Sequence, residues 1–359
     1  MRIGVPKNGF SKDTLQNFSK SHLLYEGSVK RIYTAGAASD PEHNLVFEFT
    51  DDYSVFDWGK MPDTIPNKGE ALAHLTASLY QRLQDPKEWQ AFAKTFKNVP
   101  AKLQEQGLLT HFKGFDQDRS LLVQKINIHR PQKMTEKGRE YYIYPQKLTA
   151  PYLIPLEVVF RFEVGAGSSL TKRHPEYKSG HRFSAPYVEM FTKLEEKDRP
   201  LTEEEAMILS GLAPEKYQEV REKTALVAEI LKFWFDQKNI NLVDGKLEWG
   251  LTDKNEIMLV DAIGPDEMRL EKNQVQLSKE VLRDYYRKTP WFEQLEHAKD
   301  HNITNWKSQI SEPPPLPAEL KSLVSQMYQS LVDEVMGSDR FSCKPLNEIT
   351  EEMKCKSWS

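Results

Sequence analysis

The sequence has few of the features that mark secreted or membrane proteins. Only two cysteines, Cys343 and Cys355, occur in 359 residues, so a disulfide framework is excluded. No run of roughly 18 apolar residues is present, and the start MRIGVPKNGF lacks the apolar stretch of a signal peptide. We therefore expect a cytoplasmic protein that has no membrane partner.

The sequence also lacks a strong excess of charge and the common nucleotide-binding motifs. Its formal net charge of −4 gives no electrostatic reason to expect nucleic acid as a partner, although a small anionic substrate is compatible with it. Neither a Walker A sequence nor GxGxxG occurs, so a P-loop and a dinucleotide-binding Rossmann fold are not supported. The 39% hydrophobic and 11% aromatic content is sufficient for a packed core.

Short apolar runs and helical spacings predict an α+β fold rather than a doubly wound parallel sheet. Apolar runs separated by turn residues indicate two or three antiparallel strands within 23–50. Leucines three or four positions apart predict a helix over 68–83. Strands are expected over 120–128 and 156–162, and the charged, Tyr-rich stretch between them shows no clear periodicity.

Helix and turn signals continue in the C-terminal half of the chain. Thr202 and Glu205 form a capping box, and Pro214 suits the first turn of the next helix. A hairpin is expected over 242–263. The prolines of 311–320 indicate a linker, and the leucine spacing after it predicts a C-terminal helix that packs on the body or on a second subunit of a homo-oligomer.

The segment 243–269, VDGKLEWGLTDKNEIMLVDAIGPDEMR, carries the strongest chemical signal. A four-residue loop at 253–256 would pair Glu248 with Asp261 and separate an apolar face from a charged face. Two facing carboxylates repel unless a cation lies between them, and Mg²⁺ prefers one or two carboxylates together with phosphate oxygens. The alternative is a solvated polar face on an edge hairpin. The apolar face would hold Leu247, Trp249, Leu251, Met258, Val260 and Ala262, and the charged face Asp244, Lys246, Glu248 and Asp261.

Two further segments are candidates for phosphate binding. In YEGSVKRIY, Gly27 lets the backbone approach a ligand and Lys30 can reach phosphate oxygens. In PLEVVFRFEVGAGSSLTKRH, a strand ends near Arg161 and a Gly/Ser turn with basic residues follows, which suits a phosphomonoester. Ordinary surface turns with basic flanks are the alternative in both cases. The acids of 50–72 are interpreted as turn residues that bond local amides.

Taken in order, these segments resemble the phosphoribosylaminoimidazole-succinocarboxamide synthase (SAICAR synthetase) family over roughly residues 23–290. The matches are YEGSVKRIY; Thr50-Asp51, Ser54 and Phe56-Asp57; Ile65-Pro66-Asn67-Lys68-Gly69; Pro155, Glu157, Arg161 and Gly167-Ser168; and 243–250 with Asp261, Pro265, Asp266 and Arg269. Ser28 and Ala262 stand where the family usually has Lys and Glu. Each match is weak by itself, but their order is specific.

The resemblance implies an N-terminal antiparallel-sheet subdomain that binds ATP, a larger α+β subdomain, and a nucleotide cleft between them. The corresponding segments are 1–20, an N-terminal arm; 21–130, the ATP-binding subdomain; 131–310, the substrate- and metal-binding subdomain; and 311–359, the Pro-rich linker and C-terminal helix.

The resemblance also implies a role for individual residues. ATP would be bound by Gly27, Ser28, Lys30, Gln124, Lys125, Ile126 and Glu248. The carboxylated aminoimidazole ribonucleotide would be bound by Lys68, Arg161, Ser168 or Ser169, Lys172, Asp266 and Arg269. Glu248 and Asp261 would hold Mg²⁺, and Lys30, Asp244 and Asp261 would be catalytic.

The implied reaction is an ATP-dependent ligation that releases ADP and phosphate. It condenses L-aspartate with the carboxylate of 5-amino-1-(5-phosphoribosyl)imidazole-4-carboxylate in de novo purine biosynthesis, through an acyl phosphate. A carboxylate is a poor electrophile, and phosphorylation makes it reactive toward an amine. Two alternatives use the same residues: a small-molecule kinase, and a nucleotide-binding protein without catalytic activity, which Ser28 and Ala262 would explain.

Overall fold

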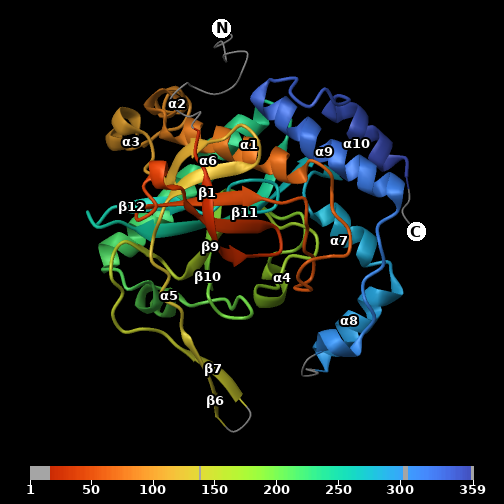
Figure 1. Cartoon of the computed structure of the whole chain (residues 1–359), viewed down its shortest axis with the longest axis horizontal. Helices are drawn as coiled ribbons and strands as arrows, with labels where there is room; N and C mark the ends of the chain where they lie inside the picture. The colour runs from red at the N-terminus through yellow and green to blue at the C-terminus, as the bar shows by residue number, and fades with distance from the viewer. Residues whose placement is uncertain (1–16, 137–138, 302–305, 357–359) are drawn as a thin grey trace. The chain divides into compact units, whose positions relative to one another are not determined.

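The computed structural model has the predicted α+β architecture and describes residues 17–136, 139–301 and 306–356 (Figure 1). The chain forms two compact units that are discontinuous in sequence. The first unit comprises Met1–Ser78, Lys113–Val123 and Gly264–Ser359, and the second comprises Leu79–Phe112 and Gln124–Ile263. Most of the predicted arm over 1–20 lies outside the described residues, and Lys20 already belongs to the first strand.

A five-stranded sheet in the order β1-β2-β3-β5-β4 organises the first unit. Its strands are β1 (Lys20–Glu26), β2 (Lys30–Ala35), β3 (Asn44–Phe49), β4 (Phe112–Phe115) and β5 (Ser120–Gln124). β1 pairs with β2 and β2 with β3, both antiparallel, which confirms the strands predicted within 23–50. The strand predicted over 120–128 is shorter and ends at Gln124. Beyond it, Asn127 forms only an isolated bridge with Tyr152.

The remaining elements of the first unit come mostly from the C-terminal third of the chain. They are η1 (Ala37–Ser39), β13 (Met268–Lys272), β14 (Val275–Gln276), α7 (Glu280–Tyr286), α8 (Pro290–Asp300), η2 (Trp306–Gln309), α9 (Ala318–Met336) and α10 (Leu346–Lys354). α9, drawn in blue in Figure 1, packs against α10 and ends at Gly337, whose φ is +66°. The predicted C-terminal helix is therefore present, and its leucines are buried against its own unit.

The N-terminus of α1 (Lys68–Gln84) lies very close to the end of β3. A Cβ atom on Gly69 would lie 2.6 Å from the carbonyl oxygen of Phe49, so the approach requires a glycine. The Gly69 amide donates a hydrogen bond to Asp51 Oδ1 at 2.9 Å, which satisfies one of the amides left unpaired at a helix start. The sequence order Asp51–Lys68–Gly69 thus fixes where α1 begins.

In the second unit, β10, β9 and β11 form an antiparallel sheet in that order, and β11 also pairs with β8 and β12. The elements are α2 (Pro86–Phe92), α3 (Ala101–Gln106), β6 (Gln132–Glu136), β7 (Arg139–Ile143), β8 (Tyr152–Leu153), β9 (Leu156–Glu163), α4 (Leu170–Arg173), β10 (Arg182–Thr192), α5 (Glu203–Ser210), α6 (Pro214–Asp236), β11 (Asn241–Leu251) and β12 (Ile257–Val260). α6 packs on this sheet through buried residues that include Leu231 and Trp234. The indole of Trp249 also donates to Thr224 at 2.9 Å.

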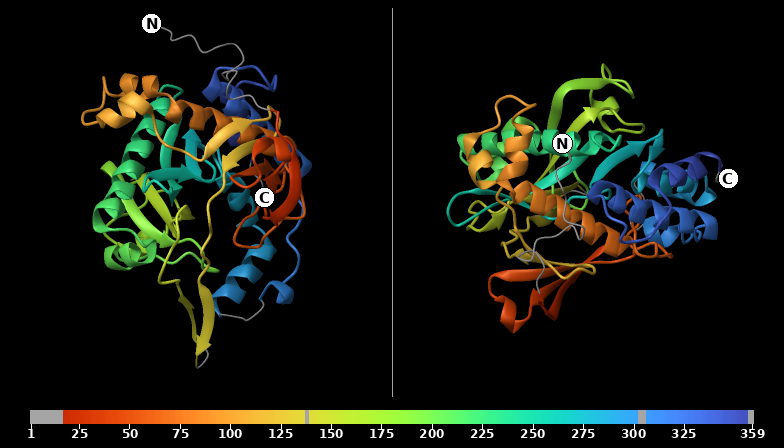
Figure 2. Two further views of the ribbon diagram at one scale, coloured as in Figure 1. Left: turned by 60° about the vertical axis from the view of Figure 1, so that its left-hand side comes forward. Right: turned by 90° about the horizontal axis from the view of Figure 1, so that it is seen from above.

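Local sequence signals predicted the starts of two helices in the second unit correctly. Both hydrogen bonds of the Thr202–Glu205 capping box are present at the start of α5, and Pro214 is the first residue of α6. The Tyr-rich stretch, which shows no clear periodicity, forms the antiparallel β6–β7 hairpin. Figure 2 shows this hairpin extending away from the rest of its unit.

The β11–β12 hairpin differs from the prediction by one residue. Its turn spans 252–256, so Glu248 pairs with Val260. The predicted pairing of Glu248 with Asp261 was wrong. The Thr252 side chain causes the longer turn, because its Oγ1 accepts the amide of Glu256 at 3.1 Å. Asp261 follows the strand with a φ of +67°.

A shift of one residue exchanges the two faces of a strand. Met258 and Val260 therefore lie on the Glu248 side of the hairpin, where they pack with Leu153, and not on the Trp249 side as predicted. The polar face around Glu248 consequently has an apolar border.

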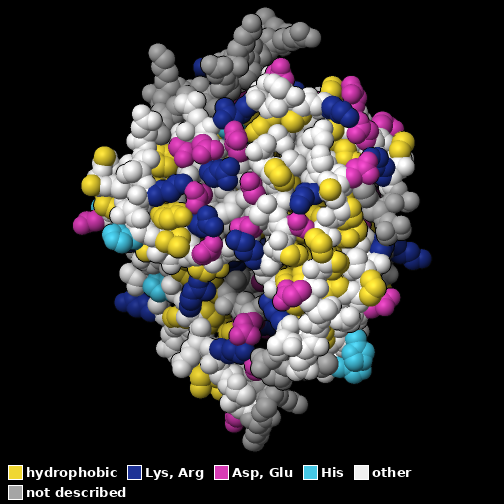
Figure 3. Space-filling model, turned by 45° about the vertical axis from the view of Figure 1, so that its right-hand side comes forward, with side chains coloured by type: hydrophobic (Ala, Val, Ile, Leu, Met, Phe, Trp, Pro, Cys, Tyr) yellow, Lys and Arg dark blue, Asp and Glu magenta, His cyan; other side chains and the backbone are white. Residues whose placement is uncertain are grey.

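The surface is of mixed charge. In Figure 3, Lys and Arg side chains lie among Asp and Glu side chains over the visible face, in keeping with the small net charge. Cys343 and Cys355 are both free, as expected from their number. Among the described helices, none combines the length and apolar composition needed to cross a bilayer.

Candidate active site

Acidic and basic side chains alternate on the polar side of the β10-β9-β11 sheet in the second unit. Lys193 Nζ lies 2.6 Å from Glu248 Oε1 and 3.2 Å from Glu157 Oε1. Lys246 Nζ lies 2.6 Å from the same Glu157 oxygen. Both carboxylates are buried. Because these pairs are shielded from water, loss of one partner would leave an uncompensated buried charge.

Asp261 adds another carboxylate to this cluster. Burial, and then the negative charge of Asp261, raise the pKa of Glu248 to about 7. The carbonyl oxygen of Asp261 accepts hydrogen bonds from the Tyr80 hydroxyl at 2.8 Å and from His111 Nε2 at 2.9 Å. These two contacts hold Asp261 at its positive φ, and backbone strain of this kind is concentrated at ligand sites.

The Glu248–Asp261 pair is chemically suited to a divalent cation. Glu248 is buried and Asp261 is partly buried, and a cation between the two carboxylates would remove the repulsion that contributes to the raised pKa of Glu248. Within the described part of the chain, no group of three or more His, Cys, Asp or Glu residues could hold a metal ion. Two carboxylates completed by phosphate oxygens and water form a set that Mg²⁺ accepts.

A second cluster surrounds Arg161 on the same sheet. Its register partner on β11 is Asp244, and Arg161 Nη1 donates to Asp244 Oδ2 at 2.9 Å. Arg161 Nε donates to Glu189 Oε2 at 2.7 Å, and Glu189 also accepts a hydrogen bond from Arg173. Arg161 and Asp244 are buried. The guanidinium is therefore held in one orientation by two carboxylates.

The Gly/Ser turn after β9 leads into α4. Ser168 is buried, and its Oγ accepts the Leu170 amide at 3.3 Å. Ser169 Oγ accepts from Arg173 Nη1 at 3.0 Å, so Ser169 joins the Arg161 cluster through Arg173 and Glu189. Lys172 is exposed on α4.

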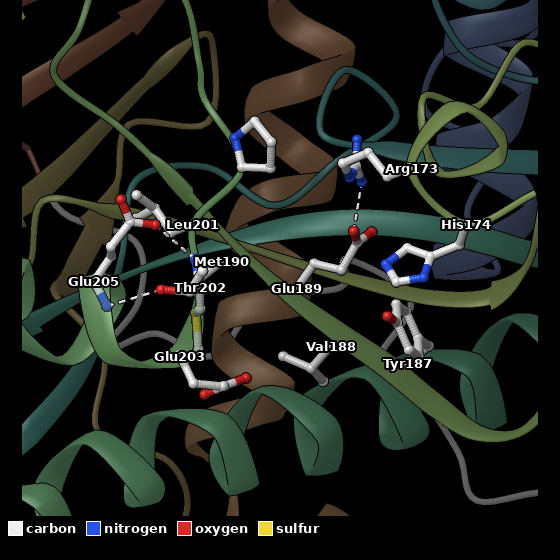
Figure 4. Close-up of a pocket in the computed structure, with 11 residues that line it drawn as sticks. Arg173, His174, Tyr187, Val188, Glu189, Met190, Leu201, Thr202, Glu203 and Glu205 are labelled. Atoms are coloured by element: carbon white, nitrogen blue, oxygen red, sulfur yellow. Dashed lines mark hydrogen bonds and ion pairs between the residues drawn. The ribbon is translucent and has the colours of Figure 1, made fainter.

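A pocket of about 420 Å³ opens beside this cluster (Figure 4). Arg173, His174, Tyr187 and Glu189 lie on one side of the pocket, and residues 200–203 and Glu205 line the other. Figure 4 shows the Arg173 guanidinium directed at the Glu189 carboxylate. Glu189 thus connects the buried guanidinium of Arg161 to an open pocket.

The first unit contains a separate buried ion pair. Lys68 Nζ lies 2.8 Å from Asp266 Oδ2 and donates to the carbonyl oxygen of Asp52 at 3.2 Å. Lys68 has no exposed surface, and Asp266 is buried. Arg269 follows three residues after Asp266, within β13. Lys68 and Asp266, which the resemblance assigns to one substrate, are therefore in direct contact.

The residues assigned to ATP fall in two places. In the first unit, Gly27 and Ser28 form the β1–β2 turn, where the Gly27 amide donates to the carbonyl of Lys30 at 2.8 Å. Lys30 Nζ lies 5.0 Å from the centre of the Phe47 ring.

In the second unit, Gln124 bonds through its amide to the His111 carbonyl at 2.7 Å, and Lys125 is exposed. Ile126 packs on the Leu153–Met258–Val260 cluster, on the Glu248 side of the hairpin.

Two residues of the clusters, Lys193 and Glu189, were not predicted. Both belong to the β10 region, which is far in sequence from the other members. The sequence signal is the spacing in YVEMFTK, where Glu189 and Lys193 lie four residues apart in a mostly apolar run that ends in buried residues. Two charges on the same face of such a run indicate a polar face that needs partners.

Comparison with known proteins identifies relatives over almost the whole chain. The sequence pattern of the family described as SAICAR synthetase matches residues 23–298. The "Putative phosphoribosylaminoimidazole-succinocarboxamide synthase" of Archaeoglobus fulgidus is 32% identical over 350 residues, which covers 91% of this chain and 98% of the relative. The phosphoribosylaminoimidazole-succinocarboxamide synthase of Thermoplasma acidophilum is 29% identical, covering 88% and 98%. A solved "SAICAR synthetase (Type-2) in complex with ADP" has a TM-score of 0.54 and 27% identity, covering 81% of this chain and 99% of its own.

Proposed function

The chain belongs to the SAICAR synthetase family, and we propose that its charged clusters bind the substrates of an ATP-dependent carbon–nitrogen ligation. The reaction joins L-aspartate to the carboxylate of 5-amino-1-(5-phosphoribosyl)imidazole-4-carboxylate and releases ADP and phosphate. The observation that carries the assignment is the buried Glu248 carboxylate, whose pKa Asp261 helps to raise, with the Lys193 ammonium 2.6 Å away.

The chemistry requires two displacements. A carboxylate oxygen of the ribonucleotide attacks the γ-phosphorus of ATP, the bond to the β–γ bridging oxygen breaks, and ADP leaves. The aspartate amine then attacks the acyl carbon, loses a proton, and inorganic phosphate leaves. Both displacements move negative charge onto leaving oxygens, so fixed cationic groups in a water-poor site favour them.

Glu248 and Asp261 would hold Mg²⁺, which neutralises phosphate charge and orients the triphosphate when it is bound. Lys193 supports this role because it already compensates Glu248 at 2.6 Å. Burial alone would lower the pKa of Lys193, but the surrounding carboxylates, with Glu248 the strongest, raise it. The ammonium therefore stays charged, and it would be available to contact a phosphate oxygen beside the carboxylates.

Nucleotide contacts are proposed for Gly27, Ser28 and Lys30 of the first unit and for Gln124, Lys125 and Ile126 of the second. The ribose phosphate of the imidazole substrate is proposed to bind Arg161, Ser168, Ser169 and Lys172 of the second unit and Arg269 of the first unit. The geometry favours a positioning role for Asp244, because it orients the Arg161 guanidinium at 2.9 Å. Lys68 is fully buried, so its proposed role is to orient Asp266.

Product analysis tests the assignment. The purified chain is incubated with ATP, Mg²⁺, the carboxylated aminoimidazole ribonucleotide and L-aspartate, and ADP and the succinocarboxamide are quantified by chromatography. We expect equal amounts of both products, and neither when any one component is omitted. Formation of ADP with a stable phosphorylated ribonucleotide in the absence of aspartate would identify a kinase instead. A folded protein that gives no product in the complete mixture would reject the ligase.

A further inference from the structure

The C-terminal helix α9 makes polar contacts with the segment that leads into α1. Ser325 Oγ donates to the carbonyl oxygen of Pro66 at 2.7 Å, and the Asn67 side-chain amide donates to Gln329 Oε1 at 3.3 Å. Ser325 and Gln329 are buried and also bond to each other at 2.8 Å. α9 lies beyond the family match, which ends at residue 298.

Tyr328 extends this row of contacts to the substrate residues. It lies between Ser325 and Gln329 on the same helical face, and its ring is almost completely buried. Its hydroxyl donates to Asp266 Oδ1 at 2.8 Å, while Lys68 Nζ holds the other oxygen of that carboxylate at 2.8 Å. The ammonium of Lys68 also lies 5.7 Å from the centre of the Tyr328 ring. Both oxygens of Asp266 are therefore fixed.

Asp266 in turn lies inside the tight turn that precedes Arg269. The amides of Glu267 and Met268 donate to the carbonyl oxygen of Gly264 at 3.0 and 2.9 Å. A carboxylate anchored at its two oxygens fixes the path of this turn, and β13 begins at Met268. Hence the direction in which Arg269 leaves the turn depends on the anchor.

We infer that Tyr328 is a positioning residue for the ribonucleotide, and that α9 completes this part of the substrate site by fixing Asp266 and the turn before Arg269. The inference rests on the proposed function, since Asp266 and Arg269 are assigned there to the imidazole ribonucleotide. An apolar helix would suffice for stability alone. Instead, α9 directs a buried polar row, Ser325, Tyr328 and Gln329, at the 66–68 segment and Asp266. Burial of these polar groups carries a desolvation free energy that leucines would avoid.

Replacement of Tyr328 by Phe removes one hydroxyl and keeps the ring. The matched control is Ser330→Ala on the same helix, which loses a single part-buried hydrogen bond to the Lys344 carbonyl and does not alter the contacts of Asp266. Both variants are compared with the wild type in melting temperature, in steady-state kinetics and in calorimetric titration with the ribonucleotide. The titration needs no turnover.

For Tyr328→Phe we expect KM and Kd for the ribonucleotide to rise about tenfold, the loss expected for a hydrogen bond to a charged group, with KM for ATP unchanged. Ser330→Ala should leave all three constants unchanged. Ser325→Ala, which frees the Pro66 carbonyl, should weaken ribonucleotide binding to a smaller degree.

Equal ribonucleotide constants in the wild type and Tyr328→Phe, with product formed by both, would overturn the role of α9 and leave the ligase assignment intact. A lower melting temperature in Tyr328→Phe, together with higher KM values for both the ribonucleotide and ATP and a higher Kd for the ribonucleotide, would also overturn it. α9 would then act through stability alone. Ribonucleotide binding without any ligation would instead reject the proposed reaction, and the Tyr328→Phe titration would still decide the role of α9.

Discussion

At the scale of single residues, the site depends on side chains that each compensate more than one neighbour. The Lys193 ammonium contacts Glu157 and Glu248, and Arg161 bridges Asp244 and Glu189. Removing Lys193 would take the paired ammonium from the buried Glu248 and would leave Glu157 with Lys246. We therefore expect that loss of the Lys193 charge lowers the free energy of unfolding strongly.

Lys193→Met keeps the length of the side chain and removes its charge. We expect the free energy of unfolding to fall by about 3 kcal/mol, the lower range for breaking a buried ion pair, because the Lys193 side chain is 24% exposed. The measurement is urea unfolding at neutral pH. Lys197→Met is the matched control, since Lys197 is exposed, and its effect should stay within about 0.5 kcal/mol. Equal stabilities of the two variants would refute the compensating role of Lys193.

The sequence allowed part of this site to be predicted. Asp244, Lys246 and Glu248 alternate within a single strand, so their common face follows from the period of two alone. Lys193 and Glu189 could not be placed in the same way. Their partners lie on β9 and β11, and strand order in a sheet depends on long-range packing.

At the scale of elements, α1 and β3 meet at a contact that permits only a glycine. The helix itself was predicted, because leucine spacing is a local property of the chain. The close contact of α1 with β3 was not predicted, because the family pattern places a glycine at position 69 but does not indicate which backbone group packs against it. The structure supplies the reason: the Phe49 carbonyl would lie 2.6 Å from a Cβ atom.

Gly69→Ala should displace the start of α1 from β3. We expect a loss of about 2 kcal/mol in the free energy of unfolding, as for other overpacked sites. Gly264→Ala provides the comparison, because its Cβ would meet no atom closer than 3.6 Å, and its stability should be unchanged or slightly higher. If thermal unfolding showed the two alanine variants to be equally stable, the close approach would not constrain the fold.

The sequence predicted the strands of the β11–β12 hairpin but not their register. The two strands and their turn were recognised from apolar runs on either side of TDKNE. The predicted register was wrong by one residue, because a hydrogen bond from the Glu256 amide to the Thr252 side chain stabilises a longer turn. Such a bond competes with the backbone ladder and is not visible in hydrophobic periodicity.

At the scale of the whole molecule, buried ion pairs make stability depend on pH. Burial alone would raise the pKa of Asp266, but Lys68, with smaller effects from Lys279 and the Tyr328 hydroxyl, lowers it below its usual value. The unfolded chain therefore takes up this proton at higher pH than the folded chain does. The stabilisation is complete above the unfolded pKa of about 3.9 and is lost as the pH falls through the folded value.

The free energy of unfolding should thus decrease on acidification below about pH 4, and part of this decrease should disappear in Asp266→Asn. Urea unfolding at a series of pH values between neutral and acidic measures the slope. Asp253→Asn, which changes an exposed turn carboxylate, should keep the wild-type slope. A slope in Asp266→Asn identical to that of the wild type would show that the Lys68–Asp266 pair makes no contribution.

Glu248 and Asp261 are proposed as a joint ligand set for the cation that accompanies ATP. Crystals grown with ADP and Mn²⁺ in place of Mg²⁺ test it directly, because anomalous scattering locates Mn²⁺ independently of the atomic coordinates. We predict an ion within about 2.5 Å of a carboxylate oxygen of each residue. An ion bound to the nucleotide elsewhere, with Lys193 still paired to Glu248 and with Asp261 far from any cation, would contradict it.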